Sequence, residues 1–467
     1  LLAPYTGLAL RAENARSATS ENSSARQQPS STPSDKTCEG QKEGPVGPDF
    51  APPLVGQVGS ICCPNKRPTW GISMDRRPVS DWASDWDYLA PDYRARTAEI
   101  WDGLRQRCPV AHTDRFQGAW LTINFDDVGK VAHDPSSFSS RVTNLYDEMP
   151  ERLMAMPPIS LDPPDHGKYR RIVLPAFTPK AVAKLISETE TYCNTLIDGF
   201  VQSGTADGSQ DFAQHIPVFV TAKLLGLPDS DGDRFRQWVH GVVEIGPSDN
   251  VASAEALREM LAYFREQLAQ RREDPREDVT TLVANGIVDG VPIPERVQAT
   301  MLILLLLGGV DTTWSAIGSA LLHLAIHSED QARLRAEPDL LDTAIEEFLR
   351  FYAPAEIGRV ATRETEIGGC PVAAGEYVWL SFPAANRDPA AFPHADQFIM
   401  DRKENRHLAF GLGIHRCLGS NLARMEMQVA LRIWLQRVPT FRLQDEATID
   451  WTSGGNILGP RRIPISF

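Results

Sequence analysis

One cysteine of the chain stands in a local sequence that favours a reactive thiolate. Cys417 lies in the run Phe410-Gly411-Leu412-Gly413-Ile414-His415-Arg416-Cys417-Leu418-Gly419, and an apolar pattern with helical spacing starts directly after the cysteine. The glycines allow a tight turn and a close approach of the backbone to a flat ligand. Cations such as His415 and Arg416, and the N-terminus of the following helix, stabilise a thiolate. A buried cysteine in a turn is the alternative, and the glycine spacing and Phe410 argue against it.

A second unusual group interrupts the most apolar part of the chain. Gly308-Gly309-Val310-Asp311-Thr312-Thr313 follows the leucine-rich run 301–307, inside a segment, 294–327, that we expect to be one long helix. Two glycines, each costing about 1 kcal/mol in a helix, and a buried acid beside hydroxyls require a reason. The residues alone leave two reasons open: close helix packing with a kink, or a site that handles protons.

Composition limits the class of protein. The chain has 467 residues, 42% of them hydrophobic, with a formal net charge of -14 and a pI near 5.3. This acidity argues against a nucleic-acid binder, which needs a basic face. The cysteines lack the density of a disulfide scaffold, and a thiolate requirement favours a reducing cytoplasm. The run 301–307 is shorter than the roughly 20 residues of a membrane span, so we expect no membrane partner.

The remaining pattern indicates a mainly α fold with small β-sheets. Residues 1–73 are rich in Ser, Pro, Gln and Gly without periodicity, so we expect a disordered extension followed by one large helical domain, 74–467. Apolar spacing predicts helices at 126–132, 180–200, 252–272, 294–327, 340–352 and 418–436. Strands are expected at 120–125 and within 366–380.

The cysteine run resembles the haem-binding loop of the cytochrome P450 family, Phe-x-x-Gly-x-x-x-Cys-x-Gly, at every fixed position. Three further motifs follow the family's order: a segment with His166 and Arg170, the glycine-acid-threonine group of the long helix, and Glu347-x-x-Arg350. The resemblance extends from about Asp81 to the C-terminus. It implies the cytochrome P450 fold, a single large helical domain around a buried haem.

This resemblance implies haem b, iron protoporphyrin IX, as the cofactor and Cys417 as the sulfur ligand of its iron. Haem carries two carboxylates. His166 and Arg170, four residues apart, can face one carboxylate from the same helix, and Arg359 and His415 are expected to bind carboxylate as well. The full set of expected cofactor-binding residues is His166, Arg170, Gly308, Gly309, Arg359, Phe410, Gly411, His415, Cys417 and Gly419.

The resemblance also assigns roles around the long helix. Thr312 and Asp311 are the expected catalytic residues: in the family, small residues here leave room for dioxygen, the hydroxyl hydrogen-bonds it, and the acid helps to bring protons. Glu347 and Arg350, at i and i+3, are implied to form a structural ion pair. The family usually adds an arginine where this chain has Gln397, so the third partner stays open, with Arg402 and Arg406 as candidates.

The implied activity is a monooxygenase that inserts one atom of O2 into a hydrophobic small molecule. The sequence has no dinucleotide fingerprint and no iron–sulfur cysteine spacing, so electrons are expected from a separate ferredoxin and ferredoxin reductase. These carriers are expected at the cysteine side of the haem, on a basic surface formed by Arg402, Lys403, Arg416 and Arg424.

The resemblance implies where the substrate is contacted, and the residues in those regions are mostly apolar, with flexible methionines. They are Leu145, Tyr146, Met149, Leu153, Met154, Met156, Val243, Ile303, Leu307, Val310, Ala355 and Ile357. Two alternatives remain open: a peroxide-using haem-thiolate enzyme and a non-enzymatic haem sensor. Asp311 and Thr312 argue against both, because neither needs proton delivery beside bound oxygen.

We predict that deleting residues 1–73 leaves haem content and thermal stability nearly unchanged, because the segment lacks a pattern that forms a core. Haem absorbance per protein and thermal melts of the truncated and full chains provide the measurement. A large loss of either quantity would show that the segment packs on the domain.

Overall fold

Helices form most of the chain, and the expected mainly α fold with small sheets is confirmed. The computed structural model describes residues 77–146, 155–246, 249–444, 449–451 and 456–467. The expected domain boundary at residue 73, and three expected substrate contacts (Met149, Leu153 and Met154), lie outside the described residues.

Fifteen α-helices are found within the described ranges. They are α1 (Pro91–Ala95), α2 (Thr97–Arg107), α3 (Phe125–His133), α4 (Asp165–Val173), α5 (Pro179–Ala183), α6 (Ile186–Asp198), α7 (His215–Leu225), α8 (Gly232–Val239), α9 (Asn250–Glu273), α10 (Val279–Ala284), α11 (Glu295–Ile326), α12 (Ser328–Ala336), α13 (Leu341–Phe351), α14 (Phe382–Ala385) and α15 (Ser420–Arg437). Shorter helical turns include η2 (Leu174–Phe177), η6 (His240–Ile245) and η8 (Gly413–His415).

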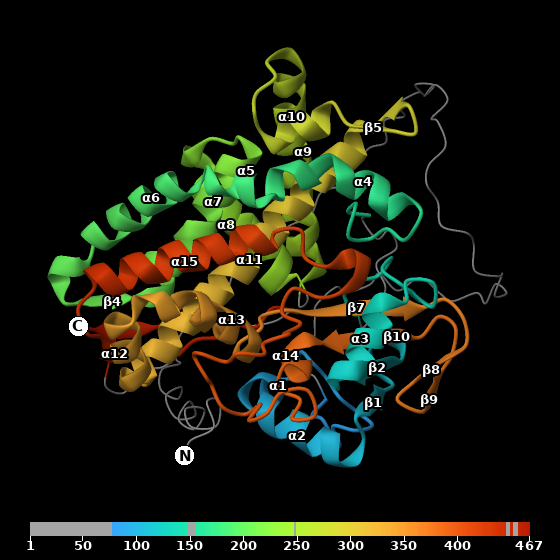
Figure 1. Ribbon diagram of the computed structural model, residues 1–467. Coiled ribbons are helices and arrows are strands. Elements are labelled where there is room, and N and C mark those ends of the chain that lie inside the picture. The colour runs from blue at the N-terminus through green and yellow to red at the C-terminus, as the bar shows by residue number, and fades with distance from the viewer. Residues whose placement is uncertain (1–76, 147–154, 247–248, 445–448, 452–455) are drawn as a thin grey trace, which may run out of the picture. The chain divides into compact units, whose positions relative to one another are not determined.

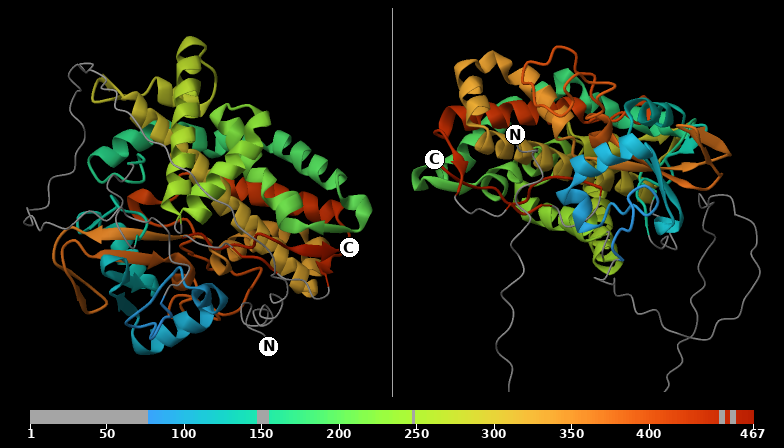
Figure 2. Two further views of the ribbon diagram at one scale, coloured as in Figure 1. Left: turned by 180° about the vertical axis from the view of Figure 1, so that it is seen from behind. Right: turned by 90° about the horizontal axis from the view of Figure 1, so that it is seen from below.

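The main sheet joins strands from both halves of the chain. Its order is β1 (Val110–Thr113), β2 (Ala119–Thr122), β10 (Tyr377–Ser381), β7 (Glu356–Ala361) and β3 (Phe138–Ser139). Only β2 and β10 pair in parallel, with Trp120 opposite Val378. In Figures 1 and 2 this sheet lies with α1, α2 and α14, while α6, α7 and α15 gather on the side of α11.

Smaller sheets complete the strands. One consists of β11 (Arg442–Leu443), β12 (Pro464–Ser466) and β4 (Thr205–Asp207), and brings the C-terminal segment against the middle of the chain. Two hairpins are β5 (Ile287–Val288) with β6 (Val291–Pro292), and β8 (Thr365–Ile367) with β9 (Cys370–Val372).

Helix α11 is the centre of the helical side. It runs for 32 residues and is apolar around nearly its whole circumference, the pattern of a buried helix rather than an amphipathic one. By length and composition it could cross a membrane, yet it is mostly buried among α7, α9 and α15. We therefore assign it as the core helix of the domain.

Two expected elements differ from the structure. The expected helix 180–200 is broken into α5 and α6, because the Lys184 N–H bonds the carbonyls of Ala181 and Val182 and tightens the last turn of α5. Both pieces then pack on α15, and α5 also packs on η2. The expected strand 120–125 ends at Thr122, because Phe125 already begins α3 and donates its N–H to Asp388 Oδ2 at 2.9 Å.

Helix α13 carries a fully buried ion pair. Glu347 and Arg350 are both 0% exposed, with Arg350 Nε at 2.8 Å from Glu347 Oε2 and Nη2 at 2.7 Å from Oε1. Arg402 is the third partner, with its Nε at 3.0 Å from Glu347 Oε2, whereas Arg406 is exposed. Gln397, which stands where the family usually has an arginine, contributes its backbone carbonyl to Arg350 at 2.7 Å.

We predict that Glu347→Ala lowers the free energy of unfolding by about 3–5 kcal/mol, because it leaves buried guanidinium groups without their carboxylate. The variant should therefore lose most of its haem content, whereas the activity of the fraction that still binds haem should change less. Denaturant titration and haem content give the measurement. The control is Asp342→Ala, an exposed acid of the same helix, which should change stability by about 0.5 kcal/mol or less. A stable, fully haem-loaded Glu347→Ala protein would contradict the burial.

Candidate active site

The backbone fixes the loop that carries Cys417. Gly411 and Gly413 have φ of +62° and +64°, a conformation that glycine adopts without strain. A Cβ on Gly413 would lie 2.5 Å from the carbonyl oxygen of Ala132, so the loop packs directly on α3. The Cys417 N–H closes the loop on the Phe410 carbonyl at 2.7 Å.

Cys417 is an exposed residue, although many protein atoms surround its sulfur. Burial raises the pKa of its thiol, while the backbone N–H of Gly419 and the guanidinium of Arg170 oppose this rise. His415 does not act as the cation we expected beside the sulfur, because burial and neighbouring cations lower its pKa to about 3. A thiol in such a place becomes a thiolate when a metal ion replaces its proton.

Four side chains beside the loop offer donors to an anion: His166 and Arg170 from α4, Arg359 from β7, and His415 from η8. We call them the carboxylate cluster. The rings of His166 and His415 are 4.3 Å apart, and the Nε2 atom of each is buried without a hydrogen-bond partner in the described part of the chain. Burial lowers the pKa of His166, with Arg170 adding to the effect.

Arg359 is a buried cation, 3% exposed. Among the described residues, the hydrogen bond that it makes is to its own neighbour, the Gly358 carbonyl, at 2.7 Å. Burial lowers the pKa of Arg359 to about 10, so the side chain stays charged at neutral pH. Buried donors that lack acceptors fit a ligand that brings carboxylates with it. The carboxylate cluster and Cys417 therefore match the two carboxylates and the metal ion of haem.

The middle of α11 opens on one face. Gly308 is exposed, and Leu304, Leu305 and Thr312 are half-buried, although most of the helix is buried. Leu304, Gly308 and Thr312 recur at i, i+4 and i+8, so these three share one side of the helix. A Cβ on Gly308 would meet nothing within 4 Å, which makes this face a place with room for a small molecule.

The neighbouring glycine has another role. A Cβ on Gly309 would lie 2.7 Å from Thr221 Oγ1 of α7, so Gly309 allows two helices to pack closely. We expected it among the cofactor-binding residues; the structure places it on the packing side instead, because consecutive helical residues point about 100° apart.

Asp311 and Thr312 lie at the edge of the open face. Thr312 Oγ1 donates to the Gly308 carbonyl at 2.9 Å, which leaves the lone pairs of the oxygen available. Asp311 is 1% exposed, and burial raises the pKa of its carboxyl to about 6. Its Oδ1 accepts a hydrogen bond from Arg461, which also donates to Glu244 Oε1 at 2.7 Å. Sequence spacing gave no signal for Arg461 or Glu244, since each is far from Asp311 in the chain.

The basic surface expected for the electron carrier is only partly present. The Arg402 side chain is 6% exposed and bound to Glu347, and Arg424 pairs with Glu346 at 2.6 Å. Both guanidinium groups are therefore paired with a carboxylate, that of Arg402 inside the fold and that of Arg424 at the half-buried surface. Lys403 and Arg416 remain exposed.

Three features together define a haem-thiolate protein. They are Cys417 in its glycine-containing loop, the carboxylate cluster with its two unpartnered histidine nitrogens, and an open helix face with a hydroxyl and a buried acid. Comparison with known proteins agrees. Residues 251–463 match the family model described as Cytochrome P450. The chain is 33% identical, over 83% of its length and 94% of the relative, to Cytochrome P450 109 of Bacillus spizizenii.

A second relative is the mycinamicin IV hydroxylase/epoxidase of Micromonospora griseorubida, 33% identical over 74% of this chain and 89% of that protein. Among solved structures, CYP109E1 from Bacillus megaterium in complex with testosterone has a TM-score of 0.75 at 28% identity, covering 81% of this chain and 99% of that one. CYP108D1 from Novosphingobium aromaticivorans has a TM-score of 0.72 at 31% identity, covering 79% and 93%. The chain belongs to the cytochrome P450 family, and it is a monooxygenase with that family's fold.

We predict that Cys417→Ser removes thiolate ligation of the haem iron, so the reduced carbon-monoxide complex loses the red-shifted absorption band that thiolate donation produces. The measurement is the difference spectrum of the reduced protein with and without carbon monoxide. Cys370→Ser, which changes a half-buried cysteine elsewhere in the chain, should keep the band. If Cys417→Ser keeps it, another cysteine is the ligand.

Proposed function

We propose that this monooxygenase inserts one oxygen atom of O2 into a hydrophobic small molecule and reduces the other atom to water. The overall reaction consumes the substrate, O2, two electrons and two protons, and yields the oxidised product and water. The observation that carries the proposal is the Thr312 hydroxyl on the open face of α11, directly beside the buried acid Asp311. A site that only bound haem would have no use for this pair.

The haem, when bound, supplies the iron at which dioxygen is activated. The chain holds it through Cys417 and the carboxylate cluster, where Arg359 and Arg170 provide charge and the two histidines provide N–H donors. Asp311, with a pKa of about 6, can release and regain a proton near neutral pH, where a proton donor works best. Thr312 Oγ1 gives its own hydrogen to Gly308, so its oxygen can accept a hydrogen bond on the open side.

The substrate proposal rests on apolar residues. Leu307, Val243 and Ile357 are half-buried, so a ligand can reach them, whereas Ile303 and Val310 of α11 are packed in the core at 0% and 1% exposure. The similarity to a mycinamicin IV hydroxylase/epoxidase and to a structure with testosterone supports a hydrophobic substrate. A ligand panel tests this proposal, because a compound that enters the site shifts the absorption spectrum of the haem.

We place the protein in the cytoplasm, with electrons from a separate ferredoxin and its reductase. The absence of a dinucleotide fingerprint and of iron–sulfur cysteine spacing in the sequence supports separate carriers. The described cysteines Cys108, Cys193, Cys370 and Cys417 are all free thiols, which suits a reducing compartment. Lys403 and Arg416 are the exposed cations that remain for an acidic carrier.

We predict that Thr312→Ala keeps its fold and its haem but loses coupling. Alanine is the better helix former, so stability should hold. Without the hydroxyl, proton handling at the oxygen site fails, so reduced cofactor and O2 are still consumed while less product and more hydrogen peroxide appear. The measurement is product and peroxide per reduced cofactor, with a confirmed substrate and ferredoxin.

Two variants control this experiment. Thr313→Ala removes a buried hydroxyl from the next position of α11 and should leave coupling unchanged. Asp311→Asn should slow the whole cycle, because it removes the acid that supplies protons. If Thr312→Ala forms as much product per reduced cofactor as the unchanged protein, the proposed role of Thr312 is wrong. Activity with peroxide but with no reduced cofactor would favour the peroxide-using alternative.

A further inference from the structure

Asp311 is held by a buried network that lies outside the cysteine loop. The guanidinium of Arg461 donates to Asp311 Oδ1, to Glu244 Oε1 at 2.7 Å and to Ser315 Oγ at 2.9 Å. The plane of Arg461 also lies over the Trp314 ring, 4.0 Å from its centroid. The side chains of Arg461, Glu244 and Asp311 are 9%, 5% and 1% exposed. One buried cation is thus shared between two buried acids.

The two oxygens of Asp311 have different surroundings. Oδ1 is fixed by Arg461, whereas Oδ2 is buried and has no hydrogen-bond partner in the described ranges. A buried oxygen without a hydrogen-bond partner costs stability, and a proton bound at Oδ2 would reduce that cost. Because Arg461 engages only Oδ1, a proton can be taken up or released at Oδ2 without displacing the hydrogen bond from Arg461.

The network reaches solvent through η6. His240 Nδ1 is 3.5 Å from Glu244 Oε2, and the His240 side chain is 52% exposed. Arg94 of α1 also acts on Asp311 electrostatically. The charged groups that face Asp311 therefore come from three separate elements: Arg461 from the C-terminal segment, Glu244 and His240 from η6, and Arg94 from α1.

These groups act on Asp311 with opposite signs. Burial raises the pKa of Asp311 to about 6, and Glu244 adds to the rise, while Arg461, His240 and Arg94 oppose it. Glu244 itself stays ionised: burial raises its pKa, but His240 and Arg461 outweigh burial and bring the pKa below its usual value. Near neutral pH, the ionised Glu244 therefore shares the positive charge of Arg461 with Asp311. Arg461 stabilises the carboxylate of Asp311 less than it would if Glu244 were neutral.

We propose that Arg461 is the positioning residue of the proton-handling acid: it anchors Asp311 by Oδ1, leaves Oδ2 to exchange a proton, and divides its charge between Asp311 and Glu244. The inference rests on the proposed function, in which Asp311 supplies protons. Arg461 does not transfer a proton itself, because a guanidinium is not deprotonated in proteins. Its effect is on where Asp311 lies and at which pH Asp311 is protonated.

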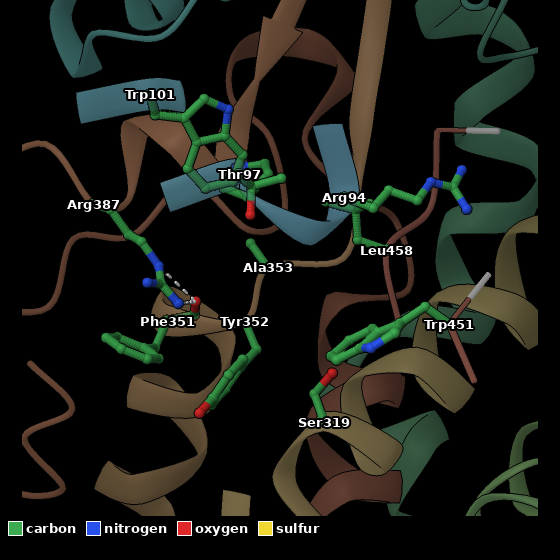
Figure 3. A pocket seen from close by; sticks show the side chains of 11 residues that line it. Arg94, Thr97, Trp101, Ser319, Phe351, Tyr352, Ala353, Arg387, Trp451 and Leu458 are labelled. Carbon is green, nitrogen blue, oxygen red and sulfur yellow. Dashed lines mark hydrogen bonds between the residues drawn. The ribbon is translucent and has the colours of Figure 1, made fainter. Parts of the chain in front are cut away.

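A second buried polar route leads away from Asp311 along α11. Ser315, Ser319 and His323 follow at successive steps of four residues, and all are buried. Ser319 lines a cavity of about 30 Å3, shown in Figure 3, together with Tyr352. The hydroxyl of Tyr352 is 2.7 Å from His323 Nδ1, and Asp330 is 2.9 Å from His323 Nε2. No hydrogen bond joins Ser315 to Ser319 in the described structure. The hydrogen bonds that start at Asp311 therefore form an unbroken chain only through Arg461.

The test is an infrared titration of the haem-loaded protein. The carbonyl-stretching band of a protonated carboxyl is followed against pH, and loss of the band in Asp311→Asn assigns it. In the unchanged protein we expect a midpoint near pH 6. Arg461→Met should raise the midpoint by about one to three units, since it removes an opposite charge. Glu244→Gln should lower it, because Arg461 then serves Asp311 alone, and Arg461→Lys should stay close to the unchanged protein.

Opposite shifts in Arg461→Met and Glu244→Gln support the proposal, because a general loosening of the site would move both variants the same way. Unchanged midpoints, or shifts of equal sign, overturn it. If Arg461→Met does not fold, the downward shift in Glu244→Gln and the near-normal value of Arg461→Lys decide the question. Arg462→Met, a change at the exposed arginine next in the chain, is the matched control and should not move the midpoint.

The second route and the proposed function have separate readouts. Asp330→Asn should leave the midpoint unchanged, and a shift there without one in Arg461→Met and Glu244→Gln would assign control to the His323 side and overturn the proposal. If the infrared shifts appear but Asp311→Asn leaves the rate at which reduced cofactor is consumed unchanged, the role of Asp311 in the reaction fails, while the anchoring by Arg461 stands.

Discussion

The position of the cysteine loop depends on a charge pair buried in α13. The bonds of Arg350 that do not go to Glu347 go to the carbonyls of Asn386, Ala395 and Gln397, at 2.9, 2.9 and 2.7 Å. Glu347 in turn accepts from the N–H of Ile399 at 2.8 Å. In the described structure, residues 386–412 contain neither helix nor strand, so these bonds replace a backbone ladder. A buried charge is stable only with its partners in place, which restricts the segment to one path.

That segment leads into the loop that carries Cys417. Asn386 Oδ1 accepts the Leu408 N–H at 2.6 Å, and two residues further along the chain the Phe410 carbonyl accepts the Cys417 N–H. Arg424 of α15 lies over the Phe410 ring, 4.4 Å from its centroid, and bonds Glu346 of α13. The loop is therefore braced from α13 before and after the cysteine. An ion pair that touches no reacting atom can in this way fix the position of the site.

What the sequence could predict follows from how local each signal is. The cysteine loop, the long apolar helix and the i, i+3 pair in α13 are contiguous patterns, and the structure shows all three. The choice of Arg402 over Arg406 required coordinates, because both are close in the chain and only the path of the backbone separates them. The contact of Arg461 with Asp311 spans 150 residues, and no pattern rule reaches that far. The side of α11 on which Gly309 lies likewise depends on where α7 packs.

Charge states around the cofactor site were also beyond pattern reasoning, yet one rule accounts for them. Burial lowers the pKa of His166 and His415, so both are neutral near pH 7 and offer N–H donors without charge. Arg359 and Arg170 then supply two positive charges, which equal the two carboxylates of a haem.

On α11 the balance is different, since a single guanidinium, Arg461, bonds two acids. The second acid leaves part of the negative charge of Asp311 uncompensated, and burial penalises that charge. The protonated form of Asp311 therefore becomes accessible near neutral pH. An unbalanced buried charge is costly, and this rule has two consequences here. The positive charges of Arg359 and Arg170 favour an anionic cofactor, and the incompletely compensated carboxylate of Asp311 can exchange a proton near neutral pH.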